Sequence, residues 1–219
     1  MEQLSRMPQA GDDERVLSGL IVRESDRLSR LLAEFLDFAR VRVTRIDPVD
    51  IAAVARGAAT LAGAHPDRRA GVDVHCATPE GSLVIEGDED LLHRAVFNLA
   101  LNAVQATPEG GRVRVDVSAL AQEHVPAGLA FERGAVMLRV SDTGGGIDPG
   151  VRDRLFDPFI TTKPGGTGLG LPVVHRAIEA HRGLVFVDSE TVGTTFTVLL
   201  PARQTDIMGN DGTDDGRAE

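Results

Sequence analysis

Apolar residues recur at three- and four-residue spacing through the first long segment of the chain, from residue 14 to about residue 43. The apolar stripe begins at Val16 and ends at Phe38, with arginine and glutamate between its members. This spacing places the apolar side chains on one face of a helix. Asp12 and Asp13 are typical of residues near a helix N-terminus. The pattern predicts a long amphipathic helix.

Helical and strand patterns alternate from residue 47 onward. Asp47-Pro48-Val49-Asp50 is interpreted as a helix start, since aspartate and proline are common there. Two segments, 112–118 and 136–141, alternate apolar and polar residues and are expected to pair as strands. Further strands are expected at 72–77, 82–85, 184–187 and 194–200, and further helices at 51–61, 88–106 and 169–181. This order predicts layers of helix and sheet.

Two asparagines lie four residues apart in the helical pattern that ends near Ala106. Asn98 and Asn102 are therefore expected on the same face of that helix, one turn apart. Asparagine is unfavourable inside a helix unless its amide has a partner. One interpretation is a pair of core asparagines with satisfied hydrogen bonds. The other is that their carbonyl oxygens serve a hard cation such as magnesium.

An aspartate and a glycine cluster, Asp142-Thr143-Gly144-Gly145-Gly146-Ile147, follow a strand pattern. A carboxylate at the end of a strand can accept a hydrogen bond from an exocyclic amine. Glycines without side chains let a flat ring approach the backbone. The alternative interpretation is an Asp-Gly turn that closes a hairpin.

A second glycine cluster, Gly165–Gly170, follows the aromatic segment Phe156–Phe159 and opens directly into a helical pattern. A turn of this kind exposes backbone N–H groups, and the helix N-terminus adds the positive end of its dipole. The segment is therefore a candidate phosphate site. A plain loop is the alternative, because glycine-rich turns are common without any ligand.

Taken together, these four motifs resemble the N, first glycine, F and second glycine boxes of bacterial sensor histidine kinases, in order and in spacing. The resemblance covers roughly residues 14–202. It implies the Bergerat ATP-binding fold shared with gyrase, a class of heat-shock chaperones and the MutL proteins. This is an α+β fold, a two-layer sandwich with helices on one face of a mixed sheet, here preceded by a long helix. ATP would lie under a mobile lid.

The resemblance also implies a division of the chain into three parts. Residues 1–46 would be a partial dimerisation and phosphotransfer region, whose second helix covers about 14–43. Residues 47–202 would be the ATP-binding catalytic domain. Residues 203–219 would be a disordered acidic tail.

At the adenine end, the resemblance implies that Asp142 receives the amine of the base. Gly144 and Gly146 would give the ring room, and Ile147 would pack nearby. Thr194 resembles the residue that supports this aspartate through a water molecule.

At the phosphate end, the resemblance implies that Asn102 is the magnesium ligand and that Asn98 lies beside it toward the phosphates. Lys163 would either reach the terminal phosphate or lie in solvent. ATP and Mg²⁺ are the implied cofactors, and Asn98, Asn102 and Lys163 are the candidate catalytic residues. The other expected nucleotide contacts are Thr162, Gly166, Thr167, Gly168, Leu169 and Gly170.

Asn98 also bears on the reaction. By resemblance, the ATP-hydrolysing relatives carry a glutamate there as the base that activates water. A carboxamide cannot take a proton at neutral pH. We therefore expect a protein-histidine kinase that transfers the γ-phosphoryl group of ATP to a histidine, for relay to a response-regulator aspartate. An ATP-binding regulatory module or pseudokinase, acting by helix-mediated association, is the alternative.

Sensor kinases carry the phosphorylated histidine before an acidic residue and, a few positions later, a proline. None of the six histidines has that context: His65, His75, His93, His124, His175 and His181. We expect the acceptor to lie outside this chain, as if the chain followed the phosphoacceptor helix of a longer kinase and could not phosphorylate itself. Expected partners are that helix, a receiver domain, and a second copy through the N-terminal helix.

Composition narrows the partners further. A net charge of −10 over 219 residues argues against nucleic acid and against an anionic membrane surface. Cys76 is the only cysteine, so no internal disulfide is expected. No segment is long and apolar enough to span a bilayer, and no signal peptide is visible. We expect a cytoplasmic domain, even if the parent protein is anchored in a membrane upstream.

Overall fold

The computed structural model describes residues 10–39, 41–126, 131, 134–163 and 166–203, and what is said of the structure refers to these. The expected tail lies outside them from residue 204 onward. The helices are α1 (Ala10–Ala39), α2 (Ile51–Gly63), η1 (Gln122–His124), η2 (Pro149–Arg154), α3 (Glu89–Ala106) and α4 (Gly170–Ala180), of which η1 and η2 are short 3-10 helices. The strands are β1 (Asp47–Asp50), β2 (Asp73–Ala77), β3 (Val84–Gly87), β4 (Arg112–Leu120), β5 (Ala135–Asp142), β6 (Leu184–Ser189) and β7 (Thr194–Pro201).

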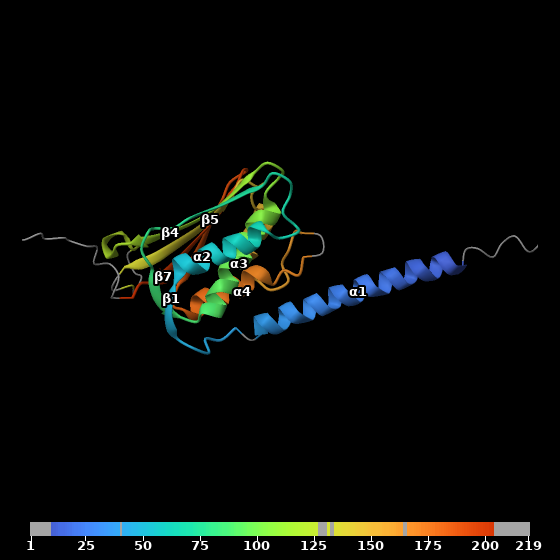
Figure 1. Cartoon of the computed structure of the whole chain (residues 1–219), viewed down its shortest axis with the longest axis horizontal. Helices are drawn as coiled ribbons and strands as arrows, with labels where there is room; N and C mark the ends of the chain where they lie inside the picture. Colours follow the sequence, from blue (N-terminus) through green and yellow to red (C-terminus); the bar gives the residue numbers. More distant parts are fainter. Residues whose placement is uncertain (1–9, 40, 127–130, 132–133, 164–165, 204–219) are drawn as a thin grey trace, which may run out of the picture.

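Five strands form a mixed sheet in the order β2-β4-β5-β7-β6. β2 runs parallel to β4, and the other neighbours are antiparallel. The predicted pairing of 112–118 with 136–141 is confirmed, because Val115 of β4 lies opposite Val140 of β5. α2, α3 and α4 lie on one side of this sheet (Figure 1). The predicted α+β class and mixed sheet are therefore confirmed.

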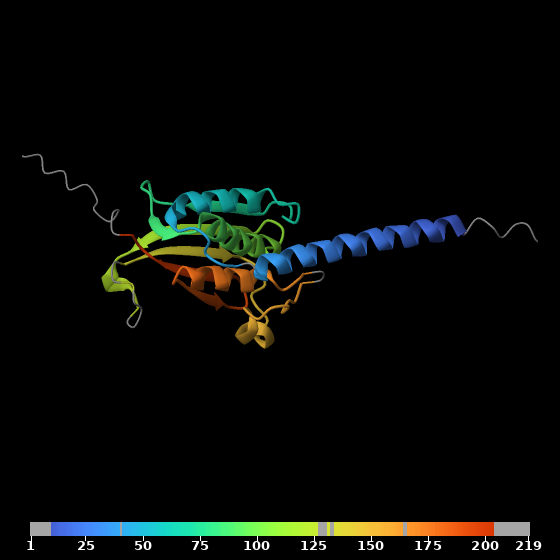
Figure 2. The same ribbon diagram turned by 90° about the horizontal axis from the view of Figure 1, so that it is seen from below.

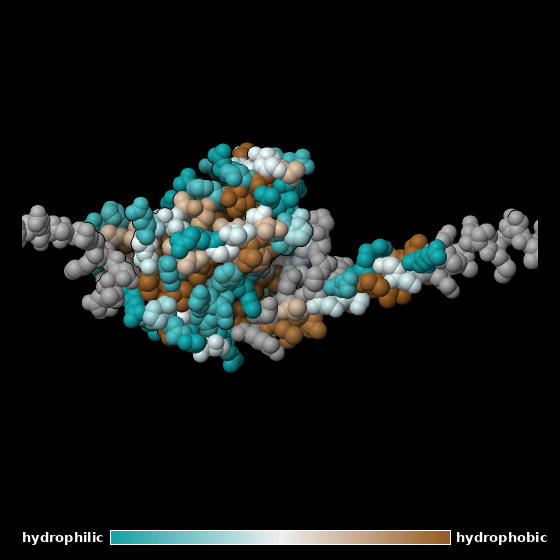
Figure 3. All heavy atoms as spheres, in the orientation of Figure 1, coloured by the Kyte–Doolittle hydropathy of each residue, from teal (hydrophilic) through white to brown (hydrophobic). Residues whose placement is uncertain are grey.

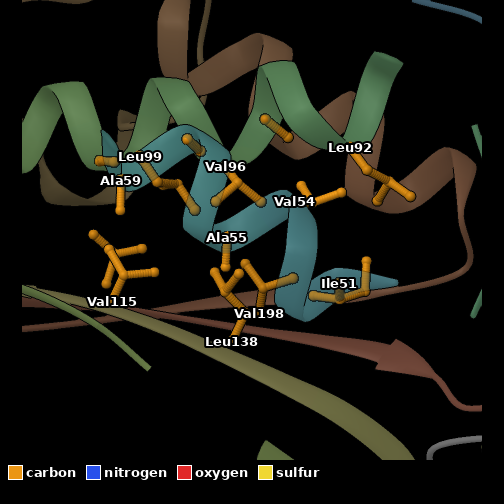
Figure 4. Close-up of a cluster of buried hydrophobic side chains, with 14 of the residues drawn as sticks. Ile51, Val54, Ala55, Ala59, Leu92, Val96, Leu99, Val115, Leu138 and Val198 are labelled. Atoms are coloured by element: carbon orange, nitrogen blue, oxygen red, sulfur yellow. The ribbon is translucent and has the colours of Figure 1, made fainter. Parts of the chain in front are cut away.

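The core lies between these three helices and the sheet. In β4, Val113, Val115 and Val117 are buried, whereas the residues between them are exposed or half-buried. α3 contributes buried residues at helical spacing, among them Val96 and Leu99. Figure 4 shows such side chains of the helices meeting those of the strands. Burial of each large apolar side chain contributes about 1.5–3 kcal/mol to folding, so this core holds α3 firmly against the sheet.

The helix start predicted at Asp47–Asp50 is confirmed at its last residue, because Asp50 is the N-cap of α2, which begins at Ile51 as expected. The prediction missed that the same four residues form β1, which pairs antiparallel with β3. Asp50 has extended dihedral angles, and its Oδ1 accepts hydrogen bonds from the N–H groups of Ala52 (3.0 Å) and Leu83 (3.1 Å). A cap residue with an extended backbone can end a strand as well as start a helix. The same residue does both here.

The predicted long helix is present as α1, although its ends differ from those expected. It begins at Ala10, so Asp12 and Asp13 lie inside its first turn, and it ends at Ala39 rather than near Val43. Its C-terminal end contacts α4, where the Arg176 guanidinium lies 4.3 Å from the centroid of the Phe38 ring. The rest of α1 extends away from the domain (Figures 1 and 2).

The apolar side chains of α1 are exposed along most of its length (Figure 3). Leu17, Ile21 and Leu28 are each more than half exposed. No described helix combines the length and the apolar character that a bilayer crossing requires. An exposed apolar stripe on a helix of this length is typical of a helix that packs against a partner.

Phe131, which lies between β4 and β5, is buried on the face of the sheet opposite the helices, together with Ala135 and Leu199. Leu120 and Met137 pack around this cluster. These residues form a small second core on the far side of the sheet.

Asp88 joins three parts of the domain just before α3. Its Oδ2 accepts hydrogen bonds from the N–H and the hydroxyl of Thr44, both at 3.0 Å, and its Oδ1 caps α3 through the N–H of Leu91 at 3.3 Å. The Asp88 N–H donates to Nε2 of the buried His181 at 2.8 Å. Because the Nδ1 of His181 lies 2.6 Å from the carbonyl of Ala177, that nitrogen must carry the proton. These hydrogen bonds therefore connect three parts of the domain: α3, α4 and the linker that follows α1.

Replacing Asp88 with alanine is expected to lower the free energy of unfolding by about 1–2 kcal/mol at neutral pH, because a helix cap and the Thr44 contacts are lost. Burial acts to raise the pKa of Asp88, but the hydrogen bonds from Thr44 and Leu91 outweigh it and leave the pKa below its ordinary value of 3.8. A carboxyl group whose pKa is lower in the folded state than in the unfolded state stabilises the fold at pH values above its unfolded-state pKa. This stabilisation is lost as the pH falls through the folded-state pKa.

Urea unfolding of the parent and the variant at neutral pH and at about pH 3 measures both effects. The difference between the two proteins should be smaller at the lower pH. Asp90→Ala, in the exposed first turn of the same helix, is the matched control and should change stability less. A loss for Asp90→Ala as large as that for Asp88→Ala would contradict the capping role.

Candidate functional site

Asp142 is the last residue of β5 and lies opposite Thr194, the first residue of β7. Its Oδ1 accepts a hydrogen bond of 2.7 Å from the N–H of Gly144. Burial raises the pKa of Asp142, while the backbone N–H groups of Gly144 and Thr194 and the charge of Lys163 act in the opposite direction. The carboxyl group is thus half-buried at the end of the central strand of the sheet, where it can receive a polar ligand group.

Two of the three glycines after Asp142, Gly144 and Gly146, leave no space for a side chain. A Cβ at Gly144 would lie 2.7 Å from the carbonyl oxygen of Ala106. Gly146 has a φ of 73°, and a side chain there would collide with the carbonyl of Glu190. At both positions the missing side chain makes room for a carbonyl group of the chain itself, which glycine allows.

Ser189 fixes this loop, and sequence reasoning missed it. Its hydroxyl accepts a hydrogen bond of 2.9 Å from the N–H of Ile147 and lies 3.2 Å from the hydroxyl of Thr194. It also donates to the carbonyl of Gly193 at 3.3 Å. The residue is an unremarkable serine at the end of a strand pattern, so only its place beside the loop reveals this role.

Asn98 and Asn102 lie on the face of α3 that meets the start of α4. The Nδ2 of Asn98 donates to the carbonyl of Gly170 at 3.4 Å. A Cβ added to Gly170 would lie 3.7 Å from the Nδ2 of Asn102. The structure thus brings the two asparagines and the second glycine motif together, as their sequence motifs predicted.

The second glycine motif forms the entry to α4. Gly168 has a φ of 69°, and its carbonyl accepts a hydrogen bond of 3.0 Å from the N–H of Phe159. The hydroxyl of Thr167 accepts from the N–H of Leu169 at 3.3 Å. Leu169, at the N-cap, makes no side-chain cap to α4. The helix N-terminus therefore lies beside the asparagines without a side-chain cap, in the arrangement that suits an anion.

The aromatic segment before this entry has a half-buried and an exposed part. The Phe156 ring packs against the core, and its centroid lies 4.9 Å from that of the His175 ring on α4. Phe159 is exposed and has a φ of 67°. Thr162 is exposed as well. The N–H of Gly166 donates to the carbonyl of Lys163 at 3.1 Å.

Lys163 lies inside the site rather than in solvent. Its Nζ donates to Oδ1 of Asn102 at 2.9 Å and to Oε1 of Gln105 at 2.8 Å. Burial lowers the pKa of Lys163, and the charges of Asp142 and Asp67 oppose this shift. Gln105 is the second residue that sequence reasoning missed, because a single glutamine on a helix carries no motif.

The residues around Asn102 fit a cation. The Lys163 ammonium already occupies the place of a cation at the Asn102 oxygen, and amide oxygens are among the ligands that hard divalent ions accept. Among the described residues, no three histidine, cysteine, aspartate or glutamate side chains gather as a metal cluster. An ion at Asn102 would be held by this amide oxygen, and magnesium needs few protein ligands when phosphates supply the others.

Comparison with known proteins decides the family. The sequence profile of the histidine kinase-, DNA gyrase B- and HSP90-like ATPases matches residues 87–204, more than half of the chain. The chain belongs to this family. The matched region begins at the end of β3 and includes the asparagines, both glycine motifs and Thr194, so the family assignment covers the whole candidate site.

The relatives that the chain resembles are bacterial sensor kinases. It is 33% identical over 198 residues to the sensor histidine kinase ZraS of Escherichia coli K12, covering 90% of this chain and 40% of that protein. It is 31% identical over 186 residues to the histidine-protein kinase AtoS of the same strain, covering 83% of this chain and 28% of that protein. The chain therefore spans less than half the length of these relatives.

Two solved structures support the same assignment. Full-length ShkA in complex with AMPPNP is 31% identical, with a TM-score of 0.68 over 87% of this chain and 39% of that one. The mycobacterial sensor histidine kinase MprB is 29% identical, with a TM-score of 0.59 over 72% of this chain and 98% of that one. The predicted resemblance to the catalytic ATP-binding domain of bacterial two-component histidine kinases is confirmed.

Proposed function

We propose that this chain binds ATP with magnesium and transfers the γ-phosphoryl group to a histidine of a two-component sensor kinase, for relay to a response-regulator aspartate. The observation that carries this proposal is the position of Asn98. This residue lies on α3 beside the start of α4, and its amide donates a hydrogen bond to the carbonyl of Gly170. A carboxamide there cannot remove a proton from water, so transfer to a separate acceptor is favoured over hydrolysis.

The adenine end of the proposed site is built from β5, β7 and the loop between Asp142 and Ile147. The Asp142 carboxylate would accept the exocyclic amine of adenine. The bare backbone at Gly144 and Gly146 would let the ring lie close, and Thr194 would support the aspartate from the neighbouring strand. AMPPNP in the ShkA complex is an ATP analogue, which agrees with ATP as the nucleotide.

The phosphate end is built from α3, the segment 161–163 that ends at Lys163, and the N-terminus of α4. The backbone N–H groups of Gly166, Gly168 and Gly170 would receive the phosphate chain, together with those of Thr167 and Leu169. Asn102 would hold magnesium, and the metal ion would neutralise charge that develops on the phosphates. Catalysis would then consist of positioning and of charge stabilisation by the chain's own amides and by Lys163.

The test supplies the acceptor separately. We expect the 219-residue chain, mixed with Mg-ATP and a phosphoacceptor hairpin of a sensor histidine kinase, to form phosphohistidine on the hairpin. Without the hairpin, ATP should be consumed far more slowly, because no general base is positioned at Asn98. Radiolabelled ATP and acid lability of the product measure the transfer.

The control for this reaction is Asn102→Ala with the same hairpin, which should lose transfer. Tight ATP binding without transfer to hairpins of several kinases would contradict the kinase proposal and favour a regulatory ATP-binding module. Rapid hydrolysis without any acceptor would contradict the role assigned to Asn98.

We further propose the division into a helical region at 1–46, a catalytic domain at 47–202 and a tail at 203–219. The start of β1 at Asp47 and the way α1 extends from the domain support the first boundary. The exposed apolar stripe of α1 supports homodimerisation through this helix. A response-regulator receiver domain would be the partner of the phosphorylated histidine, and the negative net charge favours neither nucleic acid nor a membrane surface. We propose a cytoplasmic location.

A further inference from the structure

Lys163 is docked by a glutamine that no motif assigns. Gln105 lies three residues after Asn102 on α3, so the two amide side chains are neighbours on one helix face. The Nζ of Lys163 is shared between them, at 2.8 Å from Gln105 and 2.9 Å from Asn102. The lysine is therefore held by two amide oxygens on a rigid helix.

Asp67 orients this glutamine. The Nε2 of Gln105 donates to Oδ2 of Asp67 at 2.8 Å, which turns its Oε1 toward the lysine. Asp67 follows α2, and its backbone N–H donates to Nδ1 of His65 at 3.2 Å. Its negative charge also attracts Lys163, as does that of Asp142 at the end of β5, which has the larger effect. The loop after α2, helix α3 and the end of β5 thus all act on the ammonium group of Lys163.

We infer that Gln105, held by Asp67, docks the Lys163 ammonium on Asn102, and that nucleotide-bound magnesium must displace it; the second half rests on the proposed nucleotide site. Divalent magnesium and an ammonium group repel each other and compete for the same oxygen of Asn102. Magnesium therefore cannot bind to Asn102 while Lys163 is docked there. The apparent affinity for Mg-ATP is reduced by the fraction of molecules in which Lys163 is docked.

The choice of lysine suits this role. Among 23 lysine and arginine residues, Lys163 is the only lysine of the chain. Its ammonium is a compact charge with three donors on a flexible stem, which can leave one set of acceptors for another. An undocked Lys163 would be available to the phosphates, so release from Gln105 and engagement of the nucleotide would be one movement.

The single lysine makes the docked state directly measurable. A chain labelled with ¹³C-lysine gives one Cε signal, whose relaxation reports the mobility of Lys163 alone. We expect this methylene to be ordered in the nucleotide-free parent and mobile in Gln105→Met, which keeps the length of the side chain but loses its oxygen. Gln122→Met, on the exposed η1, is the matched control and should leave the signal unchanged.

Calorimetry of the same proteins measures the competition. We expect Gln105→Met to bind Mg-ATP about fivefold more tightly than the control, because one of the two hydrogen bonds that hold the docked state is lost while the bond to Asn102 remains. Binding of ATP in the presence of a chelator should change less. Asp67→Ala should raise both the mobility of the Lys163 methylene and the affinity for Mg-ATP, by a smaller factor. Because Asp67 is an exposed loop residue, this variant tests the same interaction without a substitution in α3.

Each outcome bears on the inference. A Lys163 methylene as mobile in the parent as in Gln105→Met would overturn docking by Gln105. If Lys163 became mobile in Gln105→Met but this variant bound Mg-ATP no more tightly than the control, the competition at Asn102 would be overturned. If no protein of the series binds ATP, the proposed function and the competition fail, while an ordered lysine released by Gln105→Met still supports the docking.

Discussion

Alanine in place of Asp142 is expected to weaken ATP binding by roughly 100-fold and to remove the preference for adenine over guanine. A hydrogen bond to a charged partner is worth about 1.5–3 kcal/mol, and each 1.4 kcal/mol is a factor of ten in affinity. The variant also loses the acceptor of the Gly144 N–H, which positions the adenine loop. Calorimetric titration with ATP and with GTP measures both effects.

The matched control for this prediction is Asp188→Ala on β6, an exposed aspartate in the same sheet. It should leave both affinities unchanged. Thermal unfolding separates a lost contact from a lost fold, since Asp142 is a half-buried surface carboxyl and its removal should leave the core between the helices and the sheet intact. If the Asp142 variant bound ATP and GTP as the parent does, the assignment of this residue to adenine would be wrong.

Much of the fold was predictable because long patterns with one period dominate it. The alternation in β4 and the three- and four-residue spacing in α3 each recur many times, so single exceptions do not disturb them. β1 was not predictable in this way. It has four residues, and its aspartates and proline are the residues of a helix start, because Asp50 both ends the strand and caps α2. Short elements of this kind are decided by tertiary pairing, here with β3.

The candidate site was predictable where glycine or a paired asparagine is needed, because few other residues can take their place. Gly146 and Gly168 have positive φ and close backbone neighbours, which are constraints that a sequence displays as glycine. Ser189 and Gln105 were not predictable. A serine hydroxyl or a glutamine amide acts only through what lies beside it, and these neighbours come from distant segments of the chain. Sequence spacing does not contain that information.

The second large effect is expected at Asn102. Asn102→Ala should weaken Mg-ATP binding by roughly 10–100-fold, because an oxygen ligand of the proposed metal is lost, whereas ATP in the presence of a chelator should bind nearly as it does to the parent. The loss of Lys163 docking in the same variant acts in the opposite direction and by the smaller factor, about fivefold. Titrations with ATP, with and without magnesium, measure the difference.

Asn102→Asp tests whether the oxygen at this position is what magnesium requires, because a carboxylate keeps an oxygen for the metal and an acceptor for Lys163. This variant should retain magnesium-dependent binding that Asn102→Ala loses. Both substitutions lie on a half-buried face of α3, and alanine favours the helix, so loss of the fold is not expected to account for the difference. Equal losses with and without magnesium in Asn102→Ala would place this residue on the phosphates and exclude it as the metal ligand.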